Sequence, residues 1–267
     1  MLSWESGDII ERVVRGALGW ADDVFVLDTG STDGSRDVLR RLAAGEARLR
    51  FFEAETDAAT FNHGRCINLL LEQLDALGEP PYWLAKLDCD EMFEPGFVEY
   101  SLPAIRELPR CYTEVSFRRP DLWYSEDQIF LGGPNPAFRE RAFQRWRAGL
   151  RYPETQHHLV RTLRQPAITF HSRAYLLHYE LRSRERSRLQ YERLREIDTE
   201  WSHLLLDPHS PDVRVEDFPS LRERGGDRFP STKRTLADLW AGLLLYLKRT
   251  TYRWYERTAS RRGGRSR

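Results

Sequence analysis

The pattern of apolar and polar positions is most regular in the first third of the chain. Apolar residues recur at three- and four-residue spacing across residues 8–18, which predicts a helix closed by Gly19. The apolar run at 24–27 is rich in β-forming residues and leads into a polar turn, so it predicts a strand. Residues 35–42 then have helical character. Strand, turn and helix in this order form the unit of an α/β sheet.

The same order repeats as far as the next acidic cluster. Residues 49–53 predict a second strand, 64–77 a helix, and 82–87 a third strand. Polar clusters therefore follow two strands, at 28–35 and at 88–91. Because open α/β sheets bind ligands beyond the carboxyl ends of their strands, we expect the functional site at these clusters.

The remainder of the chain is less regular. Its pattern predicts strands at 113–117, 159–163 and 174–178, a polar helix at 185–201, a Pro- and Gly-rich connecting loop at 207–232, and a helix at 236–255 followed by a basic tail. The fold class expected is therefore α/β, with a mixed, mainly parallel sheet flanked by helices and a C-terminal helical extension.

Charge is unevenly distributed along the chain. The 267 residues carry 41 Lys and Arg against 41 Asp and Glu, a formal charge of zero. Residues 1–105 carry nine basic and 20 acidic groups, whereas residues 233–267 carry ten and two. The balance excludes a uniformly basic nucleic-acid coat, and we expect no nucleic-acid partner.

Cysteine and hydropathy patterns bear on the compartment. The three cysteines, Cys66, Cys89 and Cys111, form no C-x-x-C pair, which favours a reducing cytoplasm. No secretory leader is visible at the start of the sequence, and no apolar run approaches the roughly 18–20 residues of a membrane span.

The polar turn at 28–35 has the composition of a ligand-binding loop. A carboxylate such as Asp28 at a strand end can accept hydrogen bonds from ribose hydroxyls or a base N–H, and small residues let backbone N–H groups approach a ligand. An ordinary structural turn has the same composition, so both interpretations stay open.

The second cluster places carboxylates two positions apart. Asp88, Asp90 and the adjacent Glu91 follow the third strand, where carboxylate oxygens can converge on Mg²⁺ or Mn²⁺. Such an ion would neutralise a diphosphate leaving group. A solvated acidic turn is the alternative interpretation.

Taken in order, these segments resemble glycosyltransferase family 2, whose members are inverting enzymes of GT-A fold that use nucleotide sugars. The stretches that carry the resemblance are Glu5–Arg12, Val26–Gly34, Phe61–Asn68 and the D-x-D motif in Leu87–Glu91. They cover about residues 1–100, after which the resemblance thins out. The family usually has a full first strand, whereas only residues 1–4 precede Glu5 here.

The resemblance implies roles for individual residues. Asp28 would contact the nucleoside, UDP-sugars being the favoured donors, and Arg65 would lie near the base or diphosphate, with Glu5 close to the base. Asp90 would bind Mn²⁺ or Mg²⁺, Asp88 would contact ribose or metal, and His178 would reach the metal or the diphosphate. Residues 1–105 would form the nucleotide-sugar-binding half of one GT-A domain and residues 106–206 its acceptor-binding half, followed by a connecting loop at 207–232 and an amphipathic helix with a basic tail at 233–267.

An inverting transfer also needs a carboxylate base, which removes the proton from the acceptor hydroxyl. Glu154 is our first candidate, followed by Asp127 and Glu126, and each also fits an ordinary surface acid. We expect the acceptor to be a glycan, a lipid-linked molecule or a small molecule. The loops at 118–156 would set the choice among them, and they contain no motif that identifies it.

The C-terminal helix carries apolar residues along one face and ends in a basic tail. Such a helix can lie in an anionic membrane interface, which would place the protein at the inner face of the cytoplasmic membrane. Packing on the domain is the alternative.

Two other functions remain open. A strand followed by D-x-D is also found in haloacid-dehalogenase-type phosphatases, but these need a downstream Lys, and Lys233 and Lys248 are the only ones. The other possibility is a nucleotide-sugar-binding protein without catalytic activity.

Overall fold

The computed structural model describes most of the chain: residues 1–54, 61–78, 82–122, 124, 128–130, 139–147, 149–154, 167–180, 182–183, 185, 188, 215–217 and 220–263. The strand predicted at 159–163, almost all of the helix predicted at 185–201, and the candidate bases Glu126 and Asp127 lie outside these residues.

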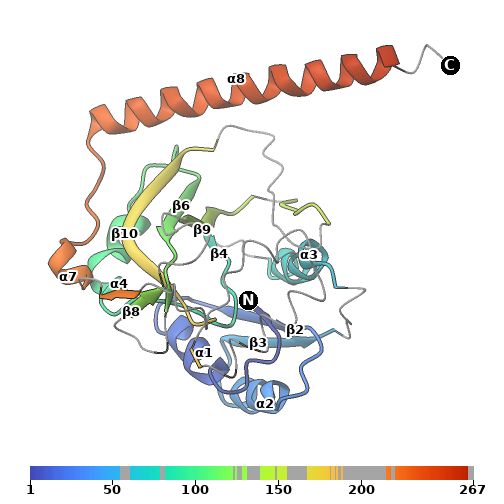
Figure 1. Ribbon diagram of the computed structural model, residues 1–267, viewed down its shortest axis with the longest axis vertical. Helices are drawn as coiled ribbons and strands as arrows, with labels where there is room; N and C mark the ends of the chain where they lie inside the picture. The colour runs from blue at the N-terminus through green and yellow to red at the C-terminus, as the bar shows by residue number, and fades with distance from the viewer. Residues whose placement is uncertain are drawn as a thin grey trace.

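A three-stranded parallel sheet forms the N-terminal part of the molecule. Its order is β1-β2-β3, and its strands are β1 (Leu2–Ser3), β2 (Val24–Asp28) and β3 (Leu49–Glu53). Helices α1 (Ile10–Leu18) and α2 (Ser35–Gly45) pack on one face, and α3 (His63–Asp75) packs on the other (Figure 1).

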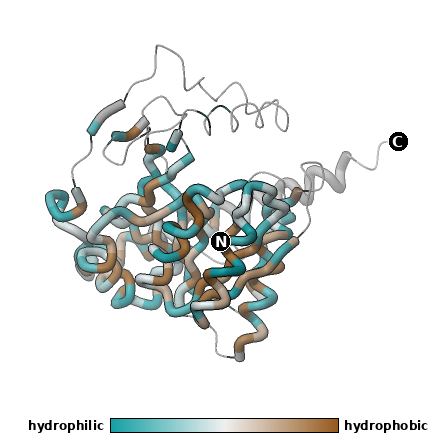
Figure 2. Tube along the Cα trace, turned by 90° about the horizontal axis from the view of Figure 1, so that it is seen from below, coloured by the Kyte–Doolittle hydropathy of each residue, from teal (hydrophilic) through white to brown (hydrophobic). Residues whose placement is uncertain are grey.

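The side chains of β2 show why helices cover both faces of this sheet. Val24 and Val26 belong to the core formed with α1 and α2, whereas Phe25 and Leu27 belong to the core formed with α3. Alternate residues of a strand point to opposite faces, and all five residues of β2 are buried. In the tube of Figure 2, hydrophobic (brown) and hydrophilic (teal) segments are interspersed along the chain. The predicted α/β class, with a parallel sheet flanked by helices, is confirmed.

A second sheet mixes parallel and antiparallel pairs, in the order β11-β8-β7-β10-β6-β9-β4. Its strands are β4 (Trp83–Ala85), β6 (Glu114–Arg118), β7 (Asp121–Leu122), β8 (Gln128–Phe130), β9 (Arg139–Arg145), β10 (Thr169–His178) and β11 (Val215–Asp217). The long strand β10 is parallel to β6 and β7, and a further strand, β5 (Glu91–Phe93), pairs with it antiparallel. A parallel bridge between Leu2 and Asp88 brings the two sheets together beside the acidic cluster.

Aromatic side chains fill the core between the second sheet and the short helices α4 (Phe97–Tyr100) and α5 (Leu102–Arg106). Phe93 stacks on Phe97 with ring centroids 3.9 Å apart, and Trp20 contacts both rings edge-on. Because Trp20 follows α1, this cluster also ties the N-terminal layer to the second sheet.

The C-terminal segment differs from the prediction. The described part of the expected loop at 207–232 contains β11 and a short helix, α7 (Leu221–Arg224). Reciprocal hydrogen bonds between Ser220 and Glu223 cap α7, and Leu221 is fully buried, so local capping and one apolar anchor offset the Pro- and Gly-rich composition.

The final helix, α8 (Thr232–Gly263), is longer at both ends than the predicted 236–255. Within the described residues, no helix combines the length and apolar character needed to cross a membrane.

Candidate functional site

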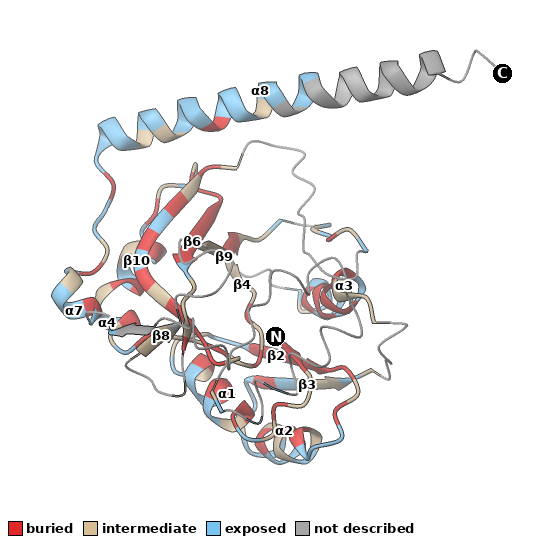
Figure 3. Cartoon of the chain, viewed as in Figure 1, coloured by how far each residue is buried: buried red, intermediate tan, exposed pale blue. Residues whose placement is uncertain are grey.

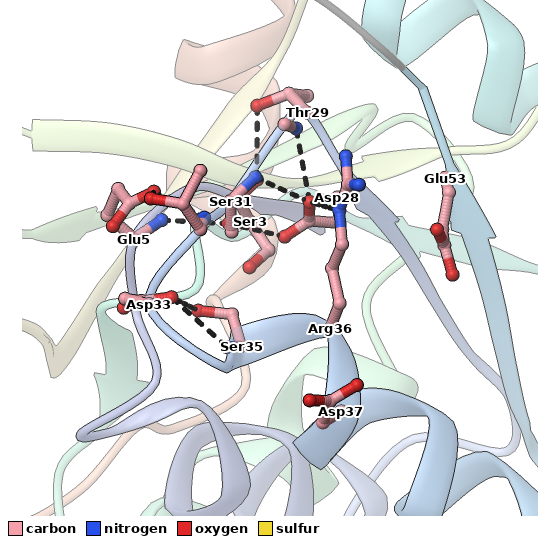
Figure 4. Close-up of polar contacts among 12 residues, drawn as sticks. Ser3, Glu5, Asp28, Thr29, Ser31, Asp33, Ser35, Arg36, Asp37 and Glu53 are labelled. Carbon is pink, nitrogen blue, oxygen red and sulfur yellow. Dashed lines mark hydrogen bonds and ion pairs between the residues drawn. The ribbon is translucent and has the colours of Figure 1, made fainter.

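The turn after β2 is built around the carboxylate of Asp28, which is fully buried. It accepts hydrogen bonds from the backbone N–H groups of Gly30 and Ser31 (3.1 and 2.9 Å), from the Ser31 hydroxyl, and from Arg36 Nε at 2.8 Å (Figure 4). Burial alone would raise the pKa of Asp28, but the hydrogen bonds from Arg36 and Ser31 outweigh it and hold the pKa below its usual range. Asp28 therefore shapes the turn.

Two more carboxylates join this turn to the loop after β1. Glu5 accepts hydrogen bonds from the backbone N–H and the hydroxyl of Thr32, at 2.6 and 3.0 Å. Asp33 accepts one from the backbone N–H of Gly7 at 2.8 Å. Glu5 adopts a left-handed backbone conformation, with φ of 47°. Such a conformation is uncommon for a residue other than glycine, and the contacts with Thr32 hold it in place.

A pocket of about 240 Å³ lies next to this pair of loops. Its lining residues come from the ends of β1, β2 and β10, from the start of α3, and from the D-x-D segment: Leu2, Ser3, Trp4, Ser6, Thr29, Phe61, His63, Asp88, Cys89, Asp90, His178 and Glu180. The pocket thus lies beyond the carboxyl ends of strands, as the sequence predicted.

Carboxylates and imidazoles meet at this pocket. His178 Nδ1 lies 2.5 Å from Asp121 Oδ1 and 3.7 Å from Glu180 Oε2, and His178 Nε2 lies 3.7 Å from Asp90 Oδ2. On the other side, His63 Nε2 lies 4.0 Å from Asp88 Oδ1.

Strand pairing explains why these distant residues converge. His178 is the last residue of β10, and it pairs with Glu91 of β5 on one side and with Asp121 of β7 on the other. A hydrogen bond of 2.8 Å from the backbone N–H of Tyr179 to the carbonyl oxygen of Asp90 fixes the next residue against the D-x-D segment.

Glu91, the last acid of the cluster at 88–91, lies behind the pocket. It is 2 % exposed and accepts hydrogen bonds of 3.0 Å from the backbone N–H of Asp88 and from Arg119. Burial and the neighbouring Asp88 raise the pKa of Glu91 to about 7, against the opposing effect of Arg119. Glu91 and Arg119 therefore support the D-x-D segment from inside.

His178 is also held in a charged environment. Burial and Arg119 lower its pKa, but Asp90 and the hydrogen-bonded Asp121 raise it more, to about 10. Burial also raises the pKa of Glu180, and the neighbouring Asp121 and Asp90 add to this effect against that of His178.

Several of these groups have the chemistry of cation ligands. Ligand atoms of Asp121, His178 and Glu180 all lie within 4.8 Å of one another, and Asp88 and Asp90 line the same pocket. Carboxylate oxygens with an imidazole nitrogen suit Mn²⁺, and the oxygens suit Mg²⁺.

Within the described part of the chain, the other predicted site residues are Glu5, Asp28, Arg65 and Glu154, and they lie around the pocket. Arg65 is exposed on the first turn of α3, and neither Arg65, Asp28 nor Glu5 lines the pocket, whereas Thr29 does. Glu154 is exposed as well. Its backbone packs on Gly64, next to His63, because Asn68 hydrogen-bonds both the N–H and the carbonyl oxygen of Tyr152.

Asp121, Glu180 and His63 were not predicted as site residues. Glu180 follows the predicted strand that ends at His178, so an acidic residue just beyond a strand end was a usable signal. No local pattern marks Asp121, whose position depends on the pairing of β7 with β10.

A larger cavity of about 570 Å³ opens near the start of β2, among side chains such as Trp20, Phe25, Leu70 and Trp83. Its lining is mainly apolar, so it suits a charged ligand less well than the acidic pocket does.

Comparison of the chain with models of protein families gives no match, and comparison with curated protein sequences gives none.

Proposed function

We propose that this protein is a metal-dependent inverting glycosyltransferase of GT-A fold, which transfers a sugar from a nucleoside diphosphate donor, UDP-sugars being favoured, to a hydroxyl acceptor. The observation that carries the proposal is the meeting of Asp88, Asp90 and His178 at one pocket, beside the turn after β2. The resemblance of residues 1–100 to glycosyltransferase family 2 supplies the reaction class.

The charge of the pocket supports a cation requirement. Asp88, Asp90 and Glu180 line it, and Asp121 lies against His178 at its edge. A donor diphosphate is itself anionic, so it would be repelled by this set unless a cation lay between them. Asp88 and Asp90 would hold Mn²⁺ or Mg²⁺, with Asp121 as a further ligand, and His178 would join them through an imidazole nitrogen after losing its proton. Bound there, the ion would stabilise negative charge on the departing diphosphate.

The nucleoside side of the site would be formed by Ser3, Trp4 and Thr29, which line the pocket. Asp28 contributes by holding the turn that presents Thr29, because its carboxylate is already engaged by Gly30, Ser31 and Arg36. Arg65 would meet the donor from the first turn of α3.

Two carboxylates are candidates for the base that accepts the proton of the acceptor hydroxyl. Glu180 lines the pocket, whereas Glu154 is exposed at its margin, near His63. A base has to reach the reacting hydroxyl, so we favour Glu180. The acceptor would be a glycan, a lipid-linked molecule or a small molecule.

The phosphatase alternative has less support. Its downstream Lys would have to be Lys233 or Lys248, and both are exposed on α8 and absent from the lining of the pocket.

A cytoplasmic location completes the proposal, and the free thiols of Cys66, Cys89 and Cys111 suit a reducing compartment.

Thermal unfolding with a panel of UDP-, GDP- and dTDP-sugars, with and without Mn²⁺, tests donor and metal binding together. At a ligand concentration of about 100 times Kd, binding stabilises a protein by about 2.7 kcal/mol. For a chain of this size, that corresponds to a rise in Tm of roughly 5–10 °C. We expect the rise only with the correct donor and Mn²⁺ together.

Two variants localise the effect. Asp90→Asn removes a pocket carboxylate and should abolish the Mn²⁺-dependent rise, whereas Asp37→Asn, at a position whose side chain is 83 % exposed on α2, should keep it. Full transferase activity in both Asp88→Asn and Asp90→Asn would contradict the metal assignment. Donor binding without transfer to any acceptor or to water would favour the non-catalytic alternative.

The identity of the base is tested separately, by comparing Glu180→Gln with Glu154→Gln. Loss of a general base typically lowers kcat about 10²- to 10⁴-fold. We expect this loss in Glu180→Gln, with the donor-dependent thermal shift retained. A loss confined to Glu154→Gln would assign the base to Glu154 instead.

A further inference from the structure

Exposed apolar side chains are concentrated on α8. Of the eleven large hydrophobic side chains that are exposed in the described part of the chain, seven lie on this helix: Leu236, Leu239, Trp240, Leu243, Leu244, Leu245 and Leu247. All but Leu245 fall on one side of the helix, because they are spaced by three or four residues. We call these six residues the α8 stripe. Trp240, within the stripe, is 63 % exposed.

The helix contacts the rest of the protein through a different side. Tyr112 donates a hydrogen bond of 2.6 Å to Asp238, and Gly242 packs so closely on Ile168 that an added Cβ would lie 2.9 Å from Ile168 Cγ1. Asp238 and Gly242 are one turn apart, and neither shares the side of the stripe. Most of the described length of α8 is exposed (Figure 3), and the helix runs at the end of the molecule opposite α1 and α2 (Figure 1).

Charge indicates what covers the stripe. Lys233 and Lys248, both exposed, stand at its two ends. Residues 233–267 carry ten basic and two acidic side chains, a formal charge of +8. An anionic surface complements this charge, whereas pairing with a second copy would bring two segments of +8 together.

We infer that α8 docks this protein on an anionic lipid bilayer, lying in the plane of the interface with the α8 stripe among the acyl chains. Leucines supply the buried apolar area, Trp240 suits the boundary between head groups and acyl chains, and the flanking basic residues face lipid phosphates. The inference does not depend on the proposed glycosyltransferase activity.

Co-sedimentation of the full-length protein with lipid vesicles tests this inference, without any donor sugar. We expect binding to phosphatidylcholine vesicles that contain phosphatidylglycerol, weaker binding to pure phosphatidylcholine, and a fall in binding as salt is added. The double variant Leu243→Gln/Leu247→Gln should lower the partition coefficient at least about tenfold. The matched control is Leu69→Gln, at a leucine of α3 that is 40 % exposed, and it should leave binding unchanged.

Because both leucines of the double variant are exposed, its melting temperature should equal that of the unchanged protein, which separates loss of binding from loss of folding. Equal vesicle binding by the double variant and the unchanged protein would overturn the inference. The inference would also be overturned if the unchanged protein formed a dimer in sedimentation velocity and did not bind vesicles, while the double variant was monomeric. The stripe would then be an interface between two copies.

Discussion

Replacing Asp28 by Asn separates two roles for this residue, shaping the turn and contacting the donor. The substitution removes a charge that is fully buried and that accepts hydrogen bonds from Gly30, Ser31 and Arg36. Breaking a buried ion pair by changing one partner costs about 3–5 kcal/mol. Because Asn keeps one acceptor oxygen for the turn, we expect a loss near the lower limit, about 3 kcal/mol. The melting temperature should then fall by roughly 6–12 °C.

The pH dependence of this loss has a defined sign. The pKa of Asp28 is held below its ordinary value of 3.8, so the ionised carboxylate stabilises the fold above that pH. Its contribution disappears as the pH falls through the lowered pKa. The difference in stability between the unchanged protein and Asp28→Asn should therefore be complete at neutral pH and should shrink below about pH 4.

Urea unfolding of Asp28→Asn, Arg36→Met and the double variant measures the coupling between the two side chains. Both single changes break the same ion pair, so the double variant should be less destabilised than the sum, by about 0.5–3 kcal/mol. Asp37→Asn, with its carboxylate 83 % exposed, serves as the control and should change stability by less than about 0.5 kcal/mol. Additive losses, or a stable Asp28→Asn variant that only fails to bind donor, would refute the role in the turn.

Three further substitutions test the packing of α3 beside the pocket, each by urea unfolding. Gly64→Ala would place a Cβ 1.9 Å from the carbonyl oxygen of Pro153, so it should lower the free energy of unfolding by about 1–3 kcal/mol. Gly45→Ala is the control, because a Cβ there would meet nothing within 4 Å; it should leave stability unchanged or raise it by about 0.4–1 kcal/mol. Equal effects of the two substitutions would contradict the close approach at Gly64. Asn68→Ala removes the hydrogen bonds of 3.0 and 2.8 Å to the backbone of Tyr152 and should cost about 1–3 kcal/mol; an unchanged midpoint would show that residues 151–154 do not depend on it. The Asn62 side chain caps α3 by accepting a hydrogen bond from the backbone N–H of Arg65. Asn62→Ala should therefore lower stability by about 1 kcal/mol, whereas Asn62→Ser, which keeps a capping oxygen, should retain most of it.

Local sequence signals predicted the N-terminal layer well, because each element there is specified by its own residues. The strand at 49–53 matches β3, and the strand at 24–27 differs from β2 only in lacking Asp28. Alternating valines with Phe25 and Leu27 suit a strand covered on both faces, and the turn residues after Leu27 end it.

The second half was harder to predict, because its elements depend on partners far along the chain. Strand β11 pairs with β8, and α7 is anchored by the buried Leu221, but the Pro- and Gly-rich composition around them favours a loop. The same limit applies to the site. Asp88, Asp90 and His178 were predicted from motifs, whereas Asp121 joins them only through the pairing of β7 with β10.

The position of β10 has a consequence for the order of events during folding. Asp121 precedes His178 by 57 positions, and the two meet only when β7 and β10 have paired. Closing such a long loop costs entropy before any contact compensates for it, so these pairings form slowly compared with α1, α2 or α3. A nascent chain that ends before residue 178 can form the parallel sheet but contains no His178 at the pocket. Under the proposed metal assignment, acquisition of cation binding during refolding would therefore mark the moment at which β7 and β10 have paired.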